Sequence, residues 1–278
     1  MFKRVSIIGA GFMGASLAIV LKERYPKTKI SVFARNDISF KRLKKLKIAD
    51  RVTKRLEDIV VDADLVVLSL PVTLIVEYFT KISALLKKDT IVMDLGSTKH
   101  AIIVAAQKQL KYPQNFVGCH PLCGSEKHGA QAARADLYKG ALCIITSPES
   151  YQATKKVKKL WKALGVKVKF LNPITHDKML SAVSHLPHIL SFTLAQLVPS
   201  SYHEVAGPSF WEMTRIAASS PQLWCDIFSV NRNNLIQDIS QYIRFLEEYK
   251  GYLEKNQMNK IYFLLQRANK KINPLRGR

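Results

Sequence analysis

The sequence predicts an α/β domain built on a parallel sheet, followed by a domain made only of helices. Short apolar runs alternate with helix-compatible segments through the first part of the chain, and a glycine-rich turn follows the first run. Runs of this kind stop after Asn172-Pro173. Strands that alternate with helices are typical of a parallel sheet with crossover connections. We therefore expect a first domain over residues 1–172 and a helical one over residues 173–278.

The expected strands are runs rich in valine, isoleucine and leucine, which favour extended structure. Helix-compatible segments separate most of them, as parallel strands require. In chain order the runs cover Val5 to Ile8, Ile30 to Phe33, Leu65 to Leu70, Thr90 to Asp94, Phe116 to Cys119, Ala141 to Thr146 and Val166 to Leu171.

The second domain is expected to hold helices over residues 175–197, 208–218, 221–254 and 257–272, each flanked by Pro, Ser, Asn or Gly. The third carries an apolar stripe from Leu223 to Leu253 that is too long for a small domain to cover alone. The prediction is a homodimer that buries the stripe between C-terminal helices. The alternative is that neighbouring helices of the same chain cover it.

The glycine-rich turn follows the first strand and precedes a helix, which is the context of a dinucleotide-binding site. The first glycine permits a tight turn, the second lets the backbone approach a pyrophosphate, and the third lets the helix pack on the strand. The helix N-terminus adds amide donors. The sequence therefore predicts a Rossmann-like dinucleotide-binding domain. Its expected cofactor contacts in this turn are Gly9, Gly11, Phe12, Met13 and Gly14.

The residues after the second strand bear on the choice between NAD and NADP. An NAD site of this fold needs a carboxylate there for the ribose hydroxyls, but Ala34 stands at that position. Arg35 offers a guanidinium fork that suits a 2′-phosphate, and Asn36 can add a hydrogen bond. We expect Arg35 and Asn36 to bind the cofactor, with NADP preferred over NAD.

Candidate catalytic residues follow two later strands, at the carboxyl edge where such sheets bind ligands. His120 lies in the segment His120-Pro121-Leu122-Cys123-Gly124-Ser125-Glu126, which places a histidine, a hydroxyl and a carboxylate on one loop. Ser97 lies in Asp94-Leu95-Gly96-Ser97-Thr98-Lys99. Its hydroxyl can either cap the following helix or point into the crevice.

The helical part adds His185 and His188 in Ser184-His185-Leu186-Pro187-His188, and Arg215 further on. Pro187 is expected to bend the helix that carries the histidines, because it lacks a backbone donor. Two histidines three residues apart can bind a metal, but no third ligand lies at a recognised spacing. We expect no metal site, and a buried structural role for His185.

Composition narrows the classes of protein. The chain has 278 residues and the charged and apolar fractions of an ordinary globular protein. The formal charge of +22 favours an anionic partner, but apolar residues at helical spacing interrupt the lysine runs, as on solvated amphipathic helices. We expect no nucleic-acid or membrane partner. The four cysteines form no disulfide framework, which fits reduced thiols in the cytoplasm. The apolar N-terminus is expected to form a strand and a helix, with no export signal.

Five ordered motifs together resemble the prephenate dehydrogenase family, which includes arogenate dehydrogenases. They are Gly9 to Gly14, Asp94 to Lys99, the HPLCGSE segment, Val183 to His188, and Thr214 to Ala217 with the Ser219 to Trp224 segment behind it. The resemblance implies a nucleotide-binding domain followed by a helical dimerisation domain. It also implies oxidative decarboxylation of prephenate to 4-hydroxyphenylpyruvate, or of arogenate to tyrosine, with NAD or NADP.

The resemblance also implies roles for single residues. His120 matches the catalytic histidine that takes a proton from the ring hydroxyl while the carbon gives hydride to the nicotinamide. Ser97 matches the serine that orients this hydroxyl and the histidine. Arg215 matches an arginine that binds a carboxylate of the dianionic substrate, and His188 matches a histidine that lines the substrate pocket.

Two alternatives stay open at this point. One is another Rossmann dehydrogenase with a helical second domain, of the β-hydroxyacid or imine-reductase type, although neither accounts for His120, His188 and Arg215 together. The other is a non-catalytic dinucleotide sensor or a nucleic-acid-associated protein that uses the positive charge. The sequence leaves open the choice between prephenate and arogenate, and regulation by tyrosine.

Overall fold

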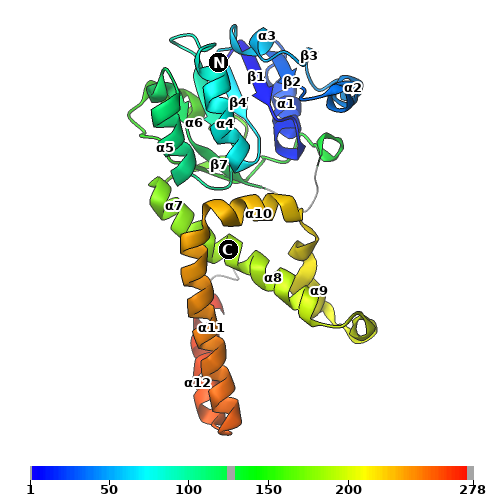
Figure 1. Cartoon of the computed structure of the whole chain (residues 1–278), viewed down its shortest axis with the longest axis vertical. Coiled ribbons are helices and arrows are strands. Elements are labelled where there is room, and N and C mark those ends of the chain that lie inside the picture. The colour runs from blue at the N-terminus through cyan, green and yellow to red at the C-terminus, as the bar shows by residue number, and fades with distance from the viewer. Residues whose placement is uncertain (1, 124–128, 274–278) are drawn as a thin grey trace. The chain divides into compact units, whose positions relative to one another are not determined.

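A computed structural model describes residues 2–123 and 129–273 (Figure 1). The chain divides into two compact units, residues 1–232 and residues 233–278. The first unit contains the α/β part and several of the helices that follow it. The expected domain boundary at residues 172 and 173 lies inside this unit and stays a prediction.

A six-stranded parallel sheet forms the centre of the α/β part, which confirms the predicted fold class. Its strand order is β3-β2-β1-β4-β5-β6, so the order reverses between β1 and β4, where such sheets bind ligands. The strands are β1 (Arg4–Ile8), β2 (Lys29–Phe33), β3 (Arg51–Thr53), β4 (Leu65–Leu68), β5 (Ile91–Asp94) and β6 (Phe116–Val117).

Helices cover both faces of this sheet because alternate strand residues point to opposite sides. Leu65 and Val67 of β4 pack in one buried cluster, and Val66 and Leu68 pack in another. The first cluster includes α1 (Phe12–Arg24), α2 (Asp37–Leu46) and α6 (Gln152–Ala163); the second includes α3 (Glu57–Val60), α4 (Val72–Ser83) and α5 (His100–Gln109).

A second, three-stranded sheet corrects the expectation of one parallel sheet. It consists of β7 (Cys119–Leu122), β8 (Leu142–Ile145) and β9 (Lys167–Phe170), and β7 runs antiparallel to β8. The predicted strand from Phe116 to Cys119 is therefore split between two sheets. Gly118 lies at the split, where a Cβ atom would come within 2.6 Å of the Thr146 hydroxyl oxygen. A side chain at this position would collide with Thr146, so the close packing at the split favours glycine.

The helical part of the first unit begins with α7 (Pro173–Leu180), capped by Asn172, whose side-chain oxygen accepts from the amide of Ile174 at 2.9 Å. A π-helical turn (Ser181–His185) connects α7 to α8 (Leu186–Leu197). Pro187 lies just after this turn. Because proline has no backbone N–H, one helical hydrogen bond is missing there, and the π-helical turn changes the hydrogen-bond pattern beside it. The elements that follow are η4 (Ser200–Val205), α9 (Pro208–Thr214), η5 (Arg215–Ala218) and α10 (Pro221–Val230); two short 3-10 helices, η1 (Pro113–Asn115) and η2 (Ala130–Ala132), precede α6.

The single helix expected over residues 221–254 is wrong, because the chain breaks it at Asn231 into α10 and α11 (Arg232–Glu254). Asn231 is buried and leaves helical geometry with φ −105° and ψ 22°. Its side-chain nitrogen donates to the backbone oxygen of Asp177 at 2.8 Å. This tertiary hydrogen bond outweighs the helical periodicity of the sequence.

The second unit contains α11 from residue 233 onward and α12 (Met258–Ile272). Many of its large hydrophobic side chains are exposed, including Ile243, Leu246 and Leu253 of the predicted stripe and Tyr262 and Phe263 of α12. In the described part of the chain, no helix is long and apolar enough to cross a membrane.

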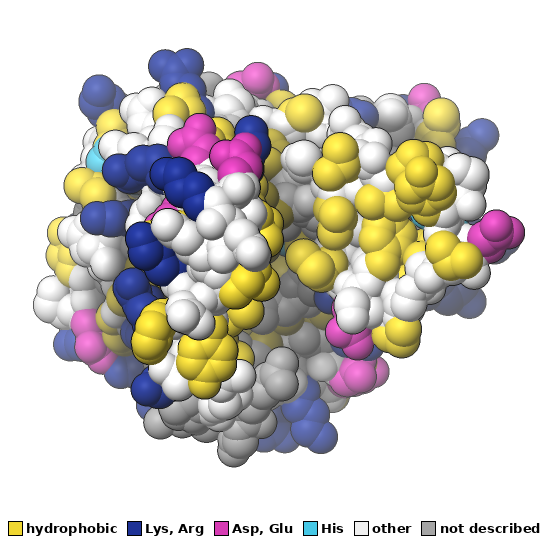
Figure 2. Space-filling model, turned by 90° about the horizontal axis from the view of Figure 1, so that it is seen from below, with side chains coloured by type: hydrophobic (Ala, Val, Ile, Leu, Met, Phe, Trp, Pro, Cys, Tyr) yellow, Lys and Arg dark blue, Asp and Glu magenta, His cyan; other side chains and the backbone are white. Residues whose placement is uncertain are grey.

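Exposed hydrophobic side chains also occur in the first unit. Tyr202, Val205, Trp211 and Met213 are all more than one third exposed. Figure 2 shows hydrophobic side chains gathered on the lobe at the right of the view. Clustered exposed hydrophobic side chains are typical of a contact surface.

Candidate active site

The glycine turn between β1 and α1 has the geometry that a dinucleotide requires. Gly9 has φ +95°, and a Cβ atom there would lie 2.2 Å from the backbone oxygen of Ser69. A Cβ atom on Gly14 would lie 2.3 Å from the backbone oxygen of Gly9, so both positions need glycine. At Gly11 a Cβ atom would meet nothing within 4 Å, which leaves space for a ligand to approach the backbone.

The helix that follows this turn fits an anionic group. Gly11 is the N-cap of α1, and the first turn of the helix contains no acidic residue. Phe12 is buried and Met13 half-buried, and the backbone oxygen of Met13 accepts from the hydroxyl of Tyr138 at 2.7 Å. The free amides and the positive end of the helix therefore suit a pyrophosphate, and this turn is the part of the chain that would hold the cofactor.

The NADP prediction concerns the residues that directly follow β2. Ala34 is buried, and Arg35 and Asn36 are exposed. Asn36 caps α2, with its side-chain oxygen accepting from the amide of Ser39 at 2.9 Å. That oxygen is therefore engaged in the helix cap, and the side-chain nitrogen is the group of Asn36 that can reach a ligand.

His120 is buried on β7, at the carboxyl edge of the large sheet. Its Nδ1 lies 2.9 Å from Nε2 of His176, and Nδ1 of His176 lies 2.7 Å from Oδ1 of Asp177. Burial lowers the pKa of His120 well below the ordinary value of histidine, and His176, Lys99 and His185 lower it further. A histidine with such a pKa is neutral at pH 7 and can accept a proton.

Ser97 and His120 lie on segments that the carboxylate of Asp94 holds together. Asp94 accepts hydrogen bonds from the amides of Gly96 at 2.8 Å and Cys119 at 3.1 Å. The ammonium group of Lys99 bonds to the same carboxylate, and it donates to the backbone oxygen of Cys119 at 2.8 Å. Asp94 and Lys99 are fully buried, so the two segments are fixed by charge-assisted hydrogen bonds.

Ser97 itself is half-buried and is not the cap of α5. The helix begins at His100, and the carboxylate of Asp177 accepts from the amides of Lys99 at 2.7 Å and His100 at 2.9 Å. Capping therefore comes from α7, a distant part of the sequence. Among the described residues, the hydroxyl of Ser97 has no hydrogen-bond partner, so the capping alternative for Ser97 is wrong.

His188 is half-buried against Trp224. The two rings are stacked, with centroids 3.5 Å apart and planes at 25°. Nδ1 of His188 lies 2.8 Å from the backbone oxygen of Ser184. Burial lowers the pKa of His188, the hydrogen bond to Ser184 opposes this effect, and nearby Arg215 lowers the pKa further. Arg215 is thus close enough to His188 for their charges to interact.

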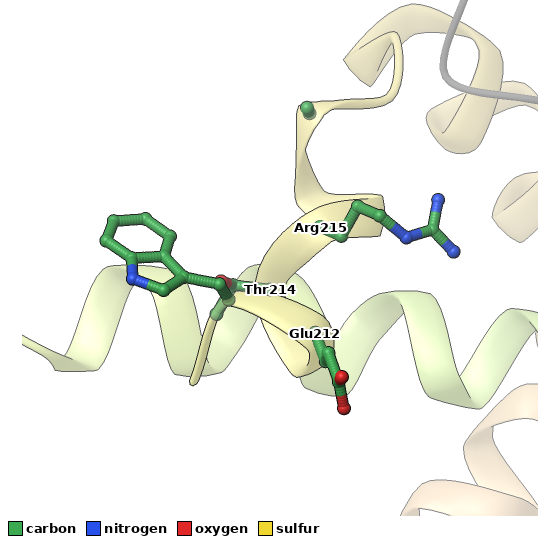
Figure 3. Close-up of a pocket in the computed structure, with 5 residues that line it drawn as sticks. Glu212, Thr214 and Arg215 are labelled. Carbon is green, nitrogen blue, oxygen red and sulfur yellow. The ribbon is translucent and has the colours of Figure 1, made fainter. Parts of the chain in front are cut away.

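Arg215 begins η5 and lines a cavity of about 550 Å³ with Trp211, Glu212, Thr214 and Ala218. Figure 3 shows its guanidinium extended away from the backbone, and the carboxylate of Glu212 points in another direction. A guanidinium in this position can bind a carboxylate.

His185 belongs to the same neighbourhood. It is buried, its Nδ1 lies 3.1 Å from the side-chain nitrogen of Asn231, and its ring meets Trp224 edge to face at 6.0 Å. It also acts electrostatically on His120. Trp224 therefore connects the surroundings of His188 and His185.

The sequence prediction missed His176 and Asp177. An adjacent histidine and aspartate just after the Asn172-Pro173 helix start was the available signal. The structure leaves Gly124, Ser125 and Glu126 outside the described residues. Within the described part, no group of three or more His, Cys, Asp or Glu could hold a metal ion, and the four cysteines are free.

The parallel sheet with its glycine turn, followed by helices that carry histidine and arginine, defines the class of two-part, dinucleotide-binding dehydrogenases. Residues 17–170 match the family model of the prephenate dehydrogenase nucleotide-binding domain, and residues 172–267 match that of the prephenate dehydrogenase dimerization domain.

Individual relatives agree with these family models. The cyclohexadienyl dehydrogenase of Zymomonas mobilis is 32% identical over 260 residues, 90% of this chain and 88% of that protein. The prephenate dehydrogenase of Bacillus subtilis is 28% identical, over 93% of this chain and 72% of that protein. The crystal structure of Aquifex aeolicus prephenate dehydrogenase in complex with hydroxyphenyl propionate and NAD+ superposes with a TM-score of 0.89 and 31% identity, covering 99% of both chains.

The chain belongs to the prephenate dehydrogenase family, and the enzyme is an oxidoreductase. This finding confirms the resemblance seen in the sequence. It also decides against the alternatives of a β-hydroxyacid dehydrogenase, an imine-type reductase and a non-catalytic protein.

Proposed function

We propose that the protein catalyses oxidative decarboxylation of prephenate or arogenate with NADP as the preferred cofactor and His120 as the general base. Membership of the family supports the reaction class. The observation that carries the assignment of the base is the position of His120, buried at the carboxyl edge of the sheet with its ring held by a second side chain.

His120 would accept the proton of the substrate ring hydroxyl as that carbon is oxidised. Its lowered pKa keeps the imidazole neutral in the free protein, so the base is ready at pH 7. A bound nicotinamide supplies the hydride acceptor. The resulting ring ketone is conjugated to the opposite ring carbon, which carries the carboxylate, so loss of carbon dioxide produces an aromatic ring without a metal. Ser97, on the segment that Asp94 ties to that of His120, would orient the hydroxyl.

Arg215 and His188 would hold the carboxylates of the substrate. Arg215 supplies the permanent positive charge, because His188 has a lowered pKa and is neutral in the free protein at pH 7. A guanidinium bound to a carboxylate through charge-assisted hydrogen bonds is a strong anchor. The proximity of the two side chains supports a shared role.

The preference for NADP is supported by the end of β2. Arg35 is exposed there, whereas Asp37, the nearest following carboxylate, is bonded to Lys54 at 2.6 Å. A cation next to the adenine ribose favours a phosphorylated cofactor. The Aquifex relative was crystallised with NAD+, so the two cofactors need a direct comparison.

A homodimer is the proposed assembly. The region from residue 172 to 267 matches a dimerization domain, and α11 and α12 carry exposed hydrophobic side chains over much of their length. A second copy of the chain would cover this apolar surface through a two-fold contact.

Purified protein should reduce NADP or NAD when prephenate or arogenate is added, and the four combinations rank the substrates and cofactors. The variant His120→Asn should lose about 10²-fold to 10⁴-fold in kcat, the range of a general base, and should keep substrate affinity. Full activity in His120→Asn would contradict the assignment of the base. Absence of reduction in all four combinations with folded wild-type protein would contradict the proposed reaction.

A further inference from the structure

We propose that His176 and Asp177 are positioning residues that fix the tautomer of His120, so that Nε2 is the nitrogen that accepts the proton. This inference rests on the proposed function of His120. It concerns residues that the sequence prediction did not include.

Three buried side chains are hydrogen-bonded one after another: His120, His176 and Asp177. Nδ1 of His120 lies 2.9 Å from Nε2 of His176, and Nδ1 of His176 lies 2.7 Å from Oδ1 of Asp177. The exposed fractions of the three residues are 9%, 0% and 5%, so water does not compete for these contacts. Among the described residues, Nε2 of His120 has no hydrogen-bond partner.

Asp177 sets the direction of the hydrogen bonds, because an ionised carboxylate can only accept. Burial raises the pKa of Asp177, but hydrogen bonds from His176 and from the amides of His100 and Lys99 outweigh this effect and lower it below the ordinary value. The carboxylate is therefore ionised at pH 7. Nδ1 of His176 must carry the hydrogen of the bond between them.

His176 transmits this direction to His120. Burial lowers the pKa of His176 even though Asp177 opposes the shift, so the ring is neutral at pH 7 and carries one hydrogen. With that hydrogen on Nδ1, Nε2 of His176 can only accept. His120 must then donate from Nδ1, which places its lone pair on Nε2.

The hydrogen-bonded series of His120, His176 and Asp177 also stabilises the charged form of His120 during the reaction. In the proton transfer, the O–H bond of the substrate hydroxyl breaks and a bond forms between the proton and Nε2 of His120. The resulting imidazolium keeps its Nδ1 hydrogen bond to His176, and the negative charge of Asp177 lies on the other side of His176. No proton has to move from His120 to Asp177, because the orientation of the ring and the nearby negative charge are sufficient to stabilise the imidazolium.

The position of the pair is itself fixed from two sides. Asp177 caps α5 through the amides of Lys99 and His100, and its backbone oxygen accepts from Asn231 at 2.8 Å. A residue whose side chain is anchored at the N-terminus of α5 and whose backbone is anchored at the break between α10 and α11 is well placed to hold a ring at one angle.

The first experiment observes the tautomer without turnover. The protein has seven histidines, so long-range ¹H–¹⁵N spectra of histidine-labelled protein contain few ring systems. The spectra of His120→Asn and His176→Gln assign the two rings by the signals that disappear. At pH 7.5 or so, Nδ1 of His120 should be protonated and Nε2 should not be. A His120 ring protonated on Nε2 would overturn the inference whatever the substrate proves to be.

The second experiment separates positioning from packing. In His176→Leu the acceptor for Nδ1 of His120 is lost, and kcat should fall roughly 10²-fold with little change in KM. The side-chain oxygen of His176→Gln can accept the same hydrogen bond, so this variant should recover part of the lost kcat and keep the tautomer of His120. Equal losses of kcat in both variants, with the tautomer unchanged, would mean that His176 only packs.

A matched control is Ser181→Ala. Ser181 is also fully buried, lies one turn after Asp177, and its hydroxyl has no hydrogen-bond partner among the described residues. This variant should keep the wild-type kcat and tautomer. If His120→Asn is inactive while His176→Leu keeps wild-type kcat and tautomer, the proposed function stands and only the positioning role is overturned.

Discussion

The imidazole of His188 lies flat against the indole of Trp224, with ring centroids 3.5 Å apart. Nδ1 of His188 is at the same time 2.8 Å from the backbone oxygen of Ser184. The hydrogen on Nδ1 is thus directed at Ser184, and in the neutral ring Nε2 has a lone pair and no hydrogen. A neutral His188 repels a carboxylate at Nε2, whereas a protonated His188 binds it.

Carboxylate binding is therefore expected to be coupled to proton uptake by His188. Burial lowers the pKa of His188 in the free protein, and a bound carboxylate would raise it. Affinity should be full below the pKa of the free protein and decline as the pH rises through the pKa of the complex. Titration calorimetry with hydroxyphenyl propionate in two buffers of different protonation enthalpy measures the protons taken up. His188→Gln should abolish the uptake, and unchanged uptake in this variant would refute the coupling.

Arg215→Ala is expected to raise KM about 10-fold to 100-fold, since a charge-assisted hydrogen bond contributes roughly 1.5–3 kcal/mol, and to change kcat much less. The KM of Arg215→Lys should lie between those of the wild type and Arg215→Ala, because lysine keeps the charge but loses the planar guanidinium. Glu212→Gln, in the same cavity, is the control for a changed charge and should leave KM nearly unchanged. A loss confined to kcat in Arg215→Ala would argue against carboxylate binding.

Arg35→Ala is expected to lower kcat/KM for NADP by roughly 10-fold or more and to leave the value for NAD nearly unchanged, because only NADP carries the 2′-phosphate. Arg4→Ala removes an exposed arginine that pairs with Asp62 at the start of β1 and is the matched control. Steady-state kinetics with both cofactors gives the four ratios needed. Equal losses of kcat/KM for NADP and NAD would indicate that Arg35 does not bind the 2′-phosphate.

Lys99→Met is expected to reduce the free energy of unfolding by about 3–5 kcal/mol, because it leaves the Asp94 carboxylate buried without its cation. The partly exposed pair of Lys158 and Glu149 provides the comparison, and Lys158→Met should lower the free energy of unfolding by less than about 1 kcal/mol. Chemical denaturation measures both. Similar small losses in the two variants would show that Lys99 contributes little. The double variant Asp94→Asn/Lys99→Met should recover part of the loss, since the unpaired charge is removed.

Local patterns in the sequence were sufficient for the glycine turn, for five of the six strands of the parallel sheet and for most helices of the second part; the short strand β3 was missed. Each depends on short-range chemistry: the φ of Gly9, the apolar strands, and helix starts such as Asn172-Pro173. The split of the strand at Gly118 could not be predicted this way, because a strand has the same pattern in either sheet. The break at Asn231 depends on a hydrogen bond to Asp177, which the sequence places far away.

The candidate site shows the same division. His120, His188 and Arg215 were predicted from ordered motifs, and the structure brings His188 and Arg215 together and gives His120 a buried setting. His176 and Asp177 were missed because they contact the ring of His120 and the N-terminus of α5 only in the folded protein. The sequence left the cap of α5 as one of two alternatives for Ser97, and the capping carboxylate of Asp177 could not be foreseen for the same reason.

Because Asp177 caps α5, the α/β part cannot be separated from α7 without loss of contacts. A fragment ending at residue 172 would contain the glycine turn, the whole large sheet and His120, yet α5 would begin with two unsatisfied amides and His120 would face no ring. Hybrid enzymes that join the first part of one relative to the helices of another must therefore carry α7 with the first part. In this chain, the first helix after the α/β part belongs, in structural terms, to the catalytic half.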